Sequence, residues 1–237
     1  MVMWKFRKSG PIGVHLTRTA AWIAQLRTRG DEVSVSALAT VDLRDLPQDQ
    51  DDSWDAEASR RIGETLSRHH FSGTKGVCCL AGEELNIQNL RLPQLPPDEL
   101  AGAIELEAQE RLTTPLQQME IRYLKAGEIR QESHIKQEMI LIAAPHELVR
   151  RRIRILEQAG LETVAVELEP LAVLRCHLRQ SVPGESKGSS TAYVHIGEEG
   201  TSVLFSDGVQ LSFLKTIPIG SRLLDESVAK HLGVEMP

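Results

Sequence analysis

Two stretches of the chain decide its fold: Val14-His15-Leu16-Thr17-Arg18-Thr19 and Val194-His195-Ile196-Gly197-Glu198-Glu199-Gly200-Thr201. Each runs from an apolar segment into a short polar turn, and a second apolar segment follows the turn. This pattern is typical of two strands joined by a tight connection. Because the two copies lie far apart in the sequence, they predict an α/β protein with two lobes and one such hairpin in each lobe.

Composition limits the classes of function. The chain has 237 residues, 41% of them hydrophobic, so it can bury a substantial core. Its net charge of −6 and its 4% aromatic content argue against a protein whose main task is binding nucleic acid. Cys78, Cys79 and Cys176 show no metal-binding spacing, which fits free thiols in a reducing cytosol. No window predicts a membrane span, and residues 1–8 lack the apolar core of a secretory signal.

Hydrophobic periodicity predicts the first lobe as sheet, helix and sheet. The expected elements are strands at 12–17, 20–27, 32–41, 75–81 and 84–92 and a helix at 54–69. Trp54, Ala58 and Ile62 recur at helical spacing and are expected to face the core. Ser53 is the expected N-cap of this helix.

Residues 93–166 predict a compact α+β module, in which helices and strands alternate. Pro97 stands where a first helical residue is favoured, with Asp98 and Glu99 in the first turn. Gly160 is expected to follow the end of a second helix. The expected elements are a helix from Pro97, strands at 119–126 and 135–143, a helix at 146–159 and a strand at 164–166.

The segment 181–190 (SVPGESKGSS) is rich in Pro, Gly and Ser and predicts a flexible linker. Strands at 191–196, 201–206 and 209–216 and a helix at 221–232 are expected after it. The expected domains are 1–92 as the first part of lobe 1, 93–166 as an inserted α+β module, 167–180 as the return to lobe 1, 181–190 as the linker and 191–237 as part of lobe 2.

Several local motifs occur in a fixed order along the chain. They are Phe6-Arg7-Lys8 before Ile12-Gly13-Val14, Arg91-Leu92-Pro93, Ala143-Ala144-Pro145, Val166-Glu167-Leu168-Glu169-Pro170 and Ile217-Pro218-Ile219-Gly220. Together they resemble the PilM family of type IV pilus assembly proteins. The resemblance implies an α/β fold of actin-like (ribonuclease H-like) lobes, with residues 93–166 as an inserted small module.

The resemblance also implies a non-catalytic scaffold or adaptor of type IV pilus, or type II secretion-like, assembly at the cytoplasmic face of the inner membrane. Such a protein docks the cytoplasmic N-terminal peptide of a bitopic inner-membrane protein of the PilN type. It associates with the membrane through this partner and self-associates into a ring. We expect the peptide in a groove between the first lobe and the inserted module, beside Arg91, Leu92, Pro93 and Leu95.

In actin-like ATPases the two hairpins bind the phosphates of a nucleotide. The corresponding residues here are His15, Thr17, Arg18 and Thr19 in the first hairpin and His195, Gly197, Gly200, Thr201 and Ser202 in the second. Both hairpins carry His where the family pattern has Asp, and imidazole is a poor ligand for a hard cation such as Mg²⁺. We therefore expect degenerate hairpins with no catalytic residue, metal or cofactor, and at most weak ATP binding.

The alternative is a nucleotide-binding ATPase or a sugar-kinase relative whose site another chain completes. The two His-for-Asp changes count against this enzyme, and no Gly-Gly adenosine motif follows the second hairpin. Catalytic hypotheses then depend on fold analogy alone, which is a weak basis for activity. The sequence therefore favours a binding protein.

Overall fold

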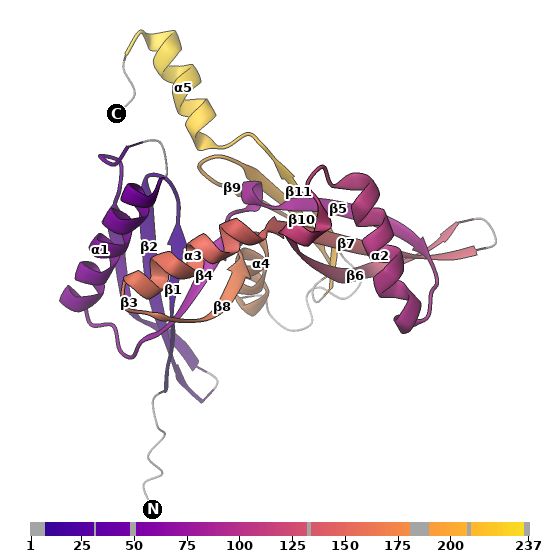
Figure 1. Ribbon diagram of the computed structural model, residues 1–237, viewed down its shortest axis with the longest axis horizontal. Coiled ribbons are helices and arrows are strands. Elements are labelled where there is room, and N and C mark those ends of the chain that lie inside the picture. The colour runs from indigo at the N-terminus through magenta and orange to yellow at the C-terminus, as the bar shows by residue number, and fades with distance from the viewer. Residues whose placement is uncertain are drawn as a thin grey trace, which may run out of the picture. The chain divides into compact units, whose positions relative to one another are not determined.

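The computed structural model describes residues 8–30, 32–47, 51–131, 134–180, 190–207 and 210–234 (Figure 1). The chain forms two compact units, and each combines two separate stretches of sequence. Unit 1 comprises Met1–Leu80 and Leu148–Glu169, and unit 2 comprises Ala81–Glu147 and Pro170–Pro237. Both units mix helices and strands, as the α/β fold class requires. No described helix is both long and apolar enough to cross a lipid bilayer.

Unit 1 is a five-stranded sheet in the order β3-β2-β1-β4-β8, with α1 and α3 against one face (Figure 1). The first three strands pair antiparallel, whereas β4 is parallel to β1 and β8 is parallel to β4. The elements are β1 (Lys8–Leu16), β2 (Ala20–Arg29), β3 (Glu32–Asp42), α1 (Asp52–Arg68), β4 (Lys75–Leu80), α3 (His146–Gln158) and β8 (Glu162–Leu168).

The core of unit 1 lies between this sheet and the two helices. Trp54, Ala58 and Ile62 are at most 1% exposed, which confirms the predicted inner face of α1. The sheet contributes Ile12, Val14, Leu16, Ala21, Ile23, Val41 and Cys78, and α3 with the residues after it contributes Ile155, Leu156, Ala159 and Leu161. Burial of this aliphatic surface is the main favourable term for folding the unit.

Asp51, not Ser53, caps α1. The Asp51 carboxylate accepts hydrogen bonds from the backbone N–H groups of Ser53 and Trp54, both at 3.0 Å. The Ser53 hydroxyl donates to the same carboxylate at 2.7 Å. The predicted N-cap was wrong because the helix begins earlier, at Asp52, and the Asp51 carboxylate caps its first free N–H groups.

Unit 2 holds two three-stranded sheets. One has the order β5-β7-β6 and packs against Ile104 and Ala108 of α2. The other has the order β11-β10-β9. The elements are β5 (Asn86–Pro93), α2 (Pro97–Arg111), β6 (Met119–Gln131), β7 (His134–Pro145), α4 (Glu169–Gln180, in unit 2 from Pro170), β9 (Thr191–Ile196), β10 (Thr201–Ser206), β11 (Leu211–Ile217) and α5 (Ser221–Leu232), with short 3₁₀ turns η1 (Gly82–Glu84) and η2 (Leu116–Gln118).

Strand pairing divides the chain differently from the expected ranges 1–92 and 93–166. β5 pairs with β7 along its whole length, from Asn86 opposite Ala143 to Pro93 opposite Lys136, so it belongs to the sheet of the module. β8 instead pairs with β4, and α3 packs in the core of unit 1. Local patterns predict each element but not its long-range neighbour.

Most of the expected linker, 181–190, lies outside the described residues.

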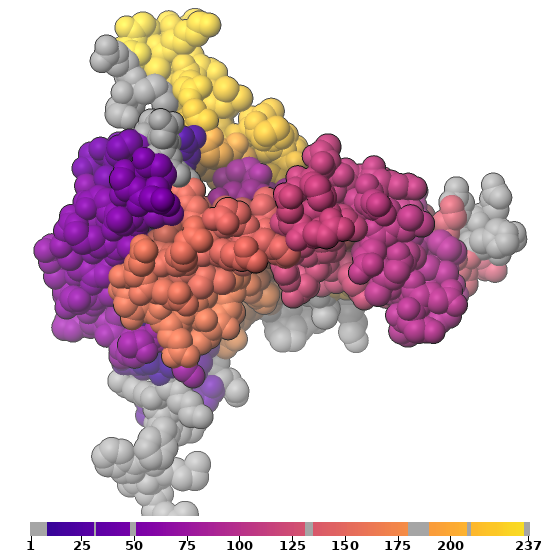
Figure 2. Space-filling model, in the orientation of Figure 1, coloured from indigo at the N-terminus to yellow at the C-terminus, as the bar shows by residue number. Residues whose placement is uncertain are grey.

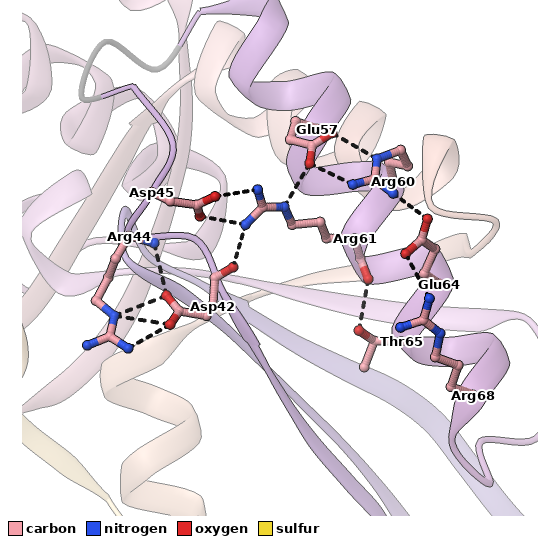
Figure 3. A network of polar contacts seen from close by, with 9 residues as sticks. All are labelled: Asp42, Arg44, Asp45, Glu57, Arg60, Arg61, Glu64, Thr65 and Arg68. Carbon is pink, nitrogen blue, oxygen red and sulfur yellow. Dashed lines mark hydrogen bonds and ion pairs between the residues drawn. The ribbon is translucent and has the colours of Figure 1, made fainter.

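An ion-pair network on the surface of unit 1 joins α1 to the segment after β3 (Figure 3). The guanidinium of Arg61 donates two hydrogen bonds to the Asp45 carboxylate, at 2.6 and 2.7 Å. It also donates to the Glu57 carboxylate at 2.8 Å and to the Asp42 carbonyl at 3.0 Å. Because the Arg61 side chain is only 23% exposed, it is the best-placed arginine of the network to fix this connection.

We expect Arg61→Ala to lower the melting temperature by roughly 2–4 °C, because about 1 kcal/mol is lost with a partly buried guanidinium that has several acceptors. Arg68→Ala on the same helix is the control. Arg68 is 75% exposed and has one 3.3 Å contact, to Glu64, so its loss should leave the melting temperature unchanged. Thermal unfolding followed by circular dichroism measures both variants. Equal shifts would contradict the role assigned to Arg61.

The network also predicts a pH dependence. Hydrogen bonds from Arg60 and Arg61 lower the pKa of Glu57 from 4.5 to about 2, and Arg61 lowers the pKa of Asp45. A carboxylate with a lowered folded-state pKa stabilises the fold above its unfolded pKa and loses that contribution as the pH falls. The difference in melting temperature between the wild type and Arg61→Ala should therefore be largest at neutral pH. It should decrease from pH 4.5 toward pH 2. A constant difference would contradict this linkage.

Candidate functional site

The first hairpin is closed by its own polar groups. Residues 17–19 connect β1 to β2, and the N–H of Thr17 donates to the carbonyl of Ala20 at 2.9 Å. The Thr17 hydroxyl oxygen accepts the N–H groups of Thr19 and Ala20, both at 3.3 Å. A phosphate-binding turn presents such N–H groups to the oxygens of its ligand. In this turn a threonine oxygen already occupies that place.

His15 lies near the end of β1, at the position where the family pattern has Asp. Its Nε2 lies 3.3 Å from a carboxylate oxygen of Glu169, the first residue of α4. Its ring stacks on Trp22, with centroids 5.5 Å apart and planes at 25°. The imidazole is thus held by a carboxylate and an indole. Among the described residues, no group of three or more His, Cys, Asp or Glu side chains could hold a metal ion.

The second hairpin is tied to the start of α5. Its turn closes through the N–H of Gly197 and the carbonyl of Gly200, at 2.8 Å. The first N–H groups of α5, from Ser221 and Arg222, donate to the carbonyls of Gly197 and Glu198 at 2.9 and 3.1 Å. A helix N-terminus attracts phosphate through such groups. Here the hairpin's own carbonyls accept these two hydrogen bonds.

Two glycines of unit 2 serve close packing between η1 and this hairpin. A Cβ on Gly82 would overlap the hydroxyl of Ser202. Ser202 itself is buried, with 2% of its surface exposed. A Cβ on Gly200 would lie 3.1 Å from the Cβ of Glu83 and 3.2 Å from the carbonyl oxygen of Ile217. The predicted phosphate residues Gly200 and Ser202 are therefore packed against protein.

A pocket of about 320 Å³ lies beside the second hairpin within unit 2. Its charged lining consists of four glutamates and one arginine, namely Glu83, Glu198, Glu199, Glu226 and Arg222. The Arg222 guanidinium donates to Glu199 at 2.7 and 2.5 Å, and this pairing raises the pKa of Arg222. Excess negative charge repels polyphosphate, so the pocket is unsuited to the anionic end of a nucleotide.

The remaining candidate residues occupy varied environments. Arg18 is exposed in the turn between β1 and β2, and His195 is half-buried in β9 opposite Ser202. The Thr201 hydroxyl donates to the carbonyl of Ile219 at 2.6 Å, which again links the hairpin to the segment before α5. The two sets of phosphate residues belong to different units, with His15 to Thr19 in unit 1 and His195 to Ser202 in unit 2.

The four residues predicted to contact a partner lie at the end of β5 and just after it. Leu92 is 4% exposed and packs in the core beneath α2, so its side chain is not presented to a partner. Arg91 is exposed and forms a 3.0 Å ion pair with Glu138 on β7. Pro93 is exposed and Leu95 is half-buried. Arg91 and Pro93 are therefore the accessible members of this set.

Sequence reasoning missed the residues that hold the hairpins in place. Glu169 pairs with the imidazole of His15, and Arg222 pairs with the carboxylate of Glu199. The members of each pair are separated in the sequence, and no local pattern connects them. Gly220 offered one signal, because it ends the motif Ile217-Pro218-Ile219-Gly220. A Cβ there would overlap the carbonyl oxygen of Glu198, which explains why this position suits glycine.

The chain matches the family described as "Type IV pilus assembly protein PilM" over residues 13–236. No curated protein matches it. A solved chain from a "PilM-PilN type IV pilus biogenesis complex" superposes with a TM-score of 0.76 and 19% identity, covering 95% of this chain and 66% of that one. The cytoplasmic domain of EpsL, an inner-membrane component of the type II secretion system of Vibrio cholerae, gives a TM-score of 0.54 and 12% identity, covering 94% and 75%.

The contact between the second hairpin and α5 can be tested with glycine substitutions. Gly220→Ala should destabilise unit 2 by roughly 1–3 kcal/mol, because the new methyl group forces the hairpin away from α5. Hydrogen exchange at the N–H groups of Ser221 and Arg222 should become faster. Gly102→Ala in α2 is the control, since a Cβ there meets no atom within 4 Å. Unchanged exchange in Gly220→Ala would contradict the assigned packing.

Proposed function

Since the chain belongs to the family of type IV pilus assembly protein PilM, we propose that it acts as a scaffold in the assembly of a type IV pilus or of a related secretion machine. It binds the cytoplasmic N-terminal tail of an inner-membrane protein. Through that partner it is held at the cytoplasmic face of the inner membrane. Copies of the chain associate there, in a ring.

The observation that carries this proposal is the likeness to a chain of the PilM–PilN complex over 95% of the present chain. The second solved relative is the cytoplasmic domain of an inner-membrane component of a secretion system. The first relative thus comes from a pilus biogenesis complex and the second from an inner-membrane component of a secretion system. The present chain spans 66% of the length of the first relative, so a partner of the PilN type is part of the proposal.

The geometry of the two hairpins supports a non-catalytic role. Thr17 accepts the turn N–H groups of the first hairpin, and carbonyls of the second hairpin accept the first N–H groups of α5. Phosphoryl transfer depends on a cation that bridges the phosphates and on donors aimed at their oxygens. At the position where the family pattern has the Asp that would hold this cation, His15 interacts with Glu169 instead.

ATP titration separates this scaffold from the enzyme alternative. A ligand at 100 times its dissociation constant would add about 2.7 kcal/mol to the free energy of unfolding. We expect no rise in melting temperature when ATP is added, with or without Mg²⁺. Inorganic phosphate and Mg²⁺ alone are the controls for ionic effects. A Mg²⁺-dependent rise with ATP would instead support the ATPase or kinase reading.

Extended peptides commonly bind at the exposed edge of a sheet, where strand pairing gives affinity and side chains give specificity. β5 is an edge strand of the module's sheet, and the accessible Arg91 and Pro93 lie at its end. The side chain of Asn89, earlier in β5, donates to the carbonyl of Leu214 on β11 at 2.9 Å, so we place the partner's tail at the end of the strand, beside Arg91 and Pro93. The placement depends on main-chain pairing at β5, because the side chain of Leu92 is buried.

A synthetic peptide with the sequence of the cytoplasmic tail of the PilN-type protein from the same genome tests this placement. Arg91→Asp should weaken binding about tenfold, which corresponds to about 1.4 kcal/mol. Arg122→Asp is the control, because Arg122 is an exposed, ion-paired arginine on β6, at the opposite edge of the same sheet. Isothermal titration calorimetry measures both. Equal losses would place the peptide elsewhere, and no binding to the wild type would refute the proposed partner.

A further inference from the structure

A groove of about 580 Å³ lies beside α2 in unit 2, apart from both hairpins. One wall is a face of the helix, and it includes Gly102, Glu105 and Leu106. The other wall is the segment that follows the helix and continues into η2, and it includes Leu112 and Leu116. In the space-filling view the outer surface of α2 faces the viewer, in magenta (Figure 2).

Both walls of the groove carry leucine side chains. Leu112 is buried in the core beneath α2, and Leu116 is half-buried against the same core. Leu106 is 61% exposed. A single exposed leucine is ordinary, but here leucines from two sides line one concave surface. A ligand that fills the groove would remove this aliphatic surface from water, which favours binding.

Gly102 opens the helix side of the groove down to the backbone of α2. After proline, glycine is the least favourable residue for a helix interior, so its use there normally has a conformational or packing reason. Gly102 is not one of the glycines with a positive φ, and a Cβ on it would meet no described atom within 4 Å. Neither reason therefore applies within the described residues. The open space allows another molecule to approach this backbone closely.

The exposed surface of α2 is negatively charged. The helix has five carboxylates and one arginine, and Arg111 pairs with Glu107 at 2.8 Å. The other four carboxylates are exposed and form no ion pair with any described residue: Asp98, Glu99, Glu105 and Glu110. The first two lie in the first turn, where they stabilise the positive end of the helix dipole. Glu105 and Glu110 lie beyond that turn, so the dipole does not account for them.

Aliphatic walls and a negative rim together select one kind of ligand. The negative charge repels nucleic acid, anionic lipid and phosphate compounds. A metal ion is excluded as well, because no group of three or more described His, Cys, Asp or Glu side chains could hold one. The leucines require aliphatic surface on the ligand, and the carboxylates require positive charge beside it. A protein segment in which Lys or Arg flanks aliphatic side chains meets both requirements.

We propose that this groove binds a basic amphipathic helix of a partner protein. Aliphatic side chains of that helix lie between Leu106 and Leu116, and Gly102 lets the two helix backbones approach each other. Its Lys or Arg side chains meet Glu105 at the groove and Glu110, which lies one turn after Leu106 on the same side of α2. Helices commonly bind in grooves through such anchors spaced one turn apart.

This site differs in its chemistry from the site that we place at the end of β5. That site presents Arg91, a cation, whereas the groove beside α2 presents carboxylates. The basic helix is therefore a second binding partner, and its binding does not require the proposed pilus function.

Selection from a phage-displayed library of random peptides of about 15 residues, or four helical turns, tests the proposal. The wild-type chain is the target, and peptides that also bind Gly102→Trp are discarded because this variant fills the groove. Circular dichroism should show that Gly102→Trp is folded, since a side chain at this position starts in open space. The retained peptides should carry Lys or Arg beside aliphatic residues at helical spacing.

A charge variant gives a second readout on a retained peptide, measured by fluorescence anisotropy. Glu105→Lys should raise its dissociation constant about tenfold, because it replaces attraction at the groove by repulsion. Glu157→Lys is the matched control. Glu157 is an exposed carboxylate of α3 that forms no ion pair with a described residue, so this variant changes the net charge equally. It should leave the dissociation constant unchanged.

Three results would overturn the proposal. The first is a selection in which no peptide distinguishes the wild type from Gly102→Trp. The second is a set of retained peptides that are mainly acidic or uncharged. The third is an equal loss of binding in Glu105→Lys and Glu157→Lys, because it would show attraction to the net charge of the chain and not to this groove.

Discussion

Each repeated hairpin begins with a strand, β1 or β9, whose two edges both need hydrogen-bonded neighbours. β1 has β2 on one edge and β4 on the other, and this wider sheet is the surface on which α1 and α3 bury their apolar residues. β9 has β10 on one edge, and the described part of the chain supplies nothing for the other. The same sequence pattern therefore lies in a closed core in unit 1, whereas the corresponding strand of unit 2 pairs on one edge within the described residues.

The polar groups of both hairpins have hydrogen-bond partners inside the protein. An anion site needs N–H donors that point at the ligand and have no stronger acceptor nearby. The Thr17 oxygen accepts such donors in the first hairpin, and the carbonyls of Gly197 and Glu198 accept them in the second. These hydrogen bonds fix one segment of the protein against another.

Local chemistry made much of the fold predictable. Alternating apolar residues located the strands, and Pro97 located the start of α2. Positions that depend on distant partners could not be found this way. Gln25 lies at an inward position of β2 and is fully buried, which its polarity does not predict. Its side-chain amide donates to the carbonyls of Gly10 and Ser72 and accepts the N–H of Ser72, so three long-range contacts make the burial favourable. The pairing of β8 with β4 and of His15 with Glu169 escaped prediction for the same reason.

The pairing of His15 with Glu169 gives a physical reason why histidine suits the first hairpin. The Glu169 side chain is only 13% exposed, and a carboxylate with so little water needs a donor or a cation beside it. An Asp in place of His15 would bring a second carboxylate to the same site. Two carboxylates so close together repel unless one takes up a proton or a cation lies between them. The imidazole of His15 instead gives Glu169 a partner that belongs to the protein itself, and the ring of Trp22 holds that imidazole by stacking. The first hairpin can thus keep its shape with no ion bound.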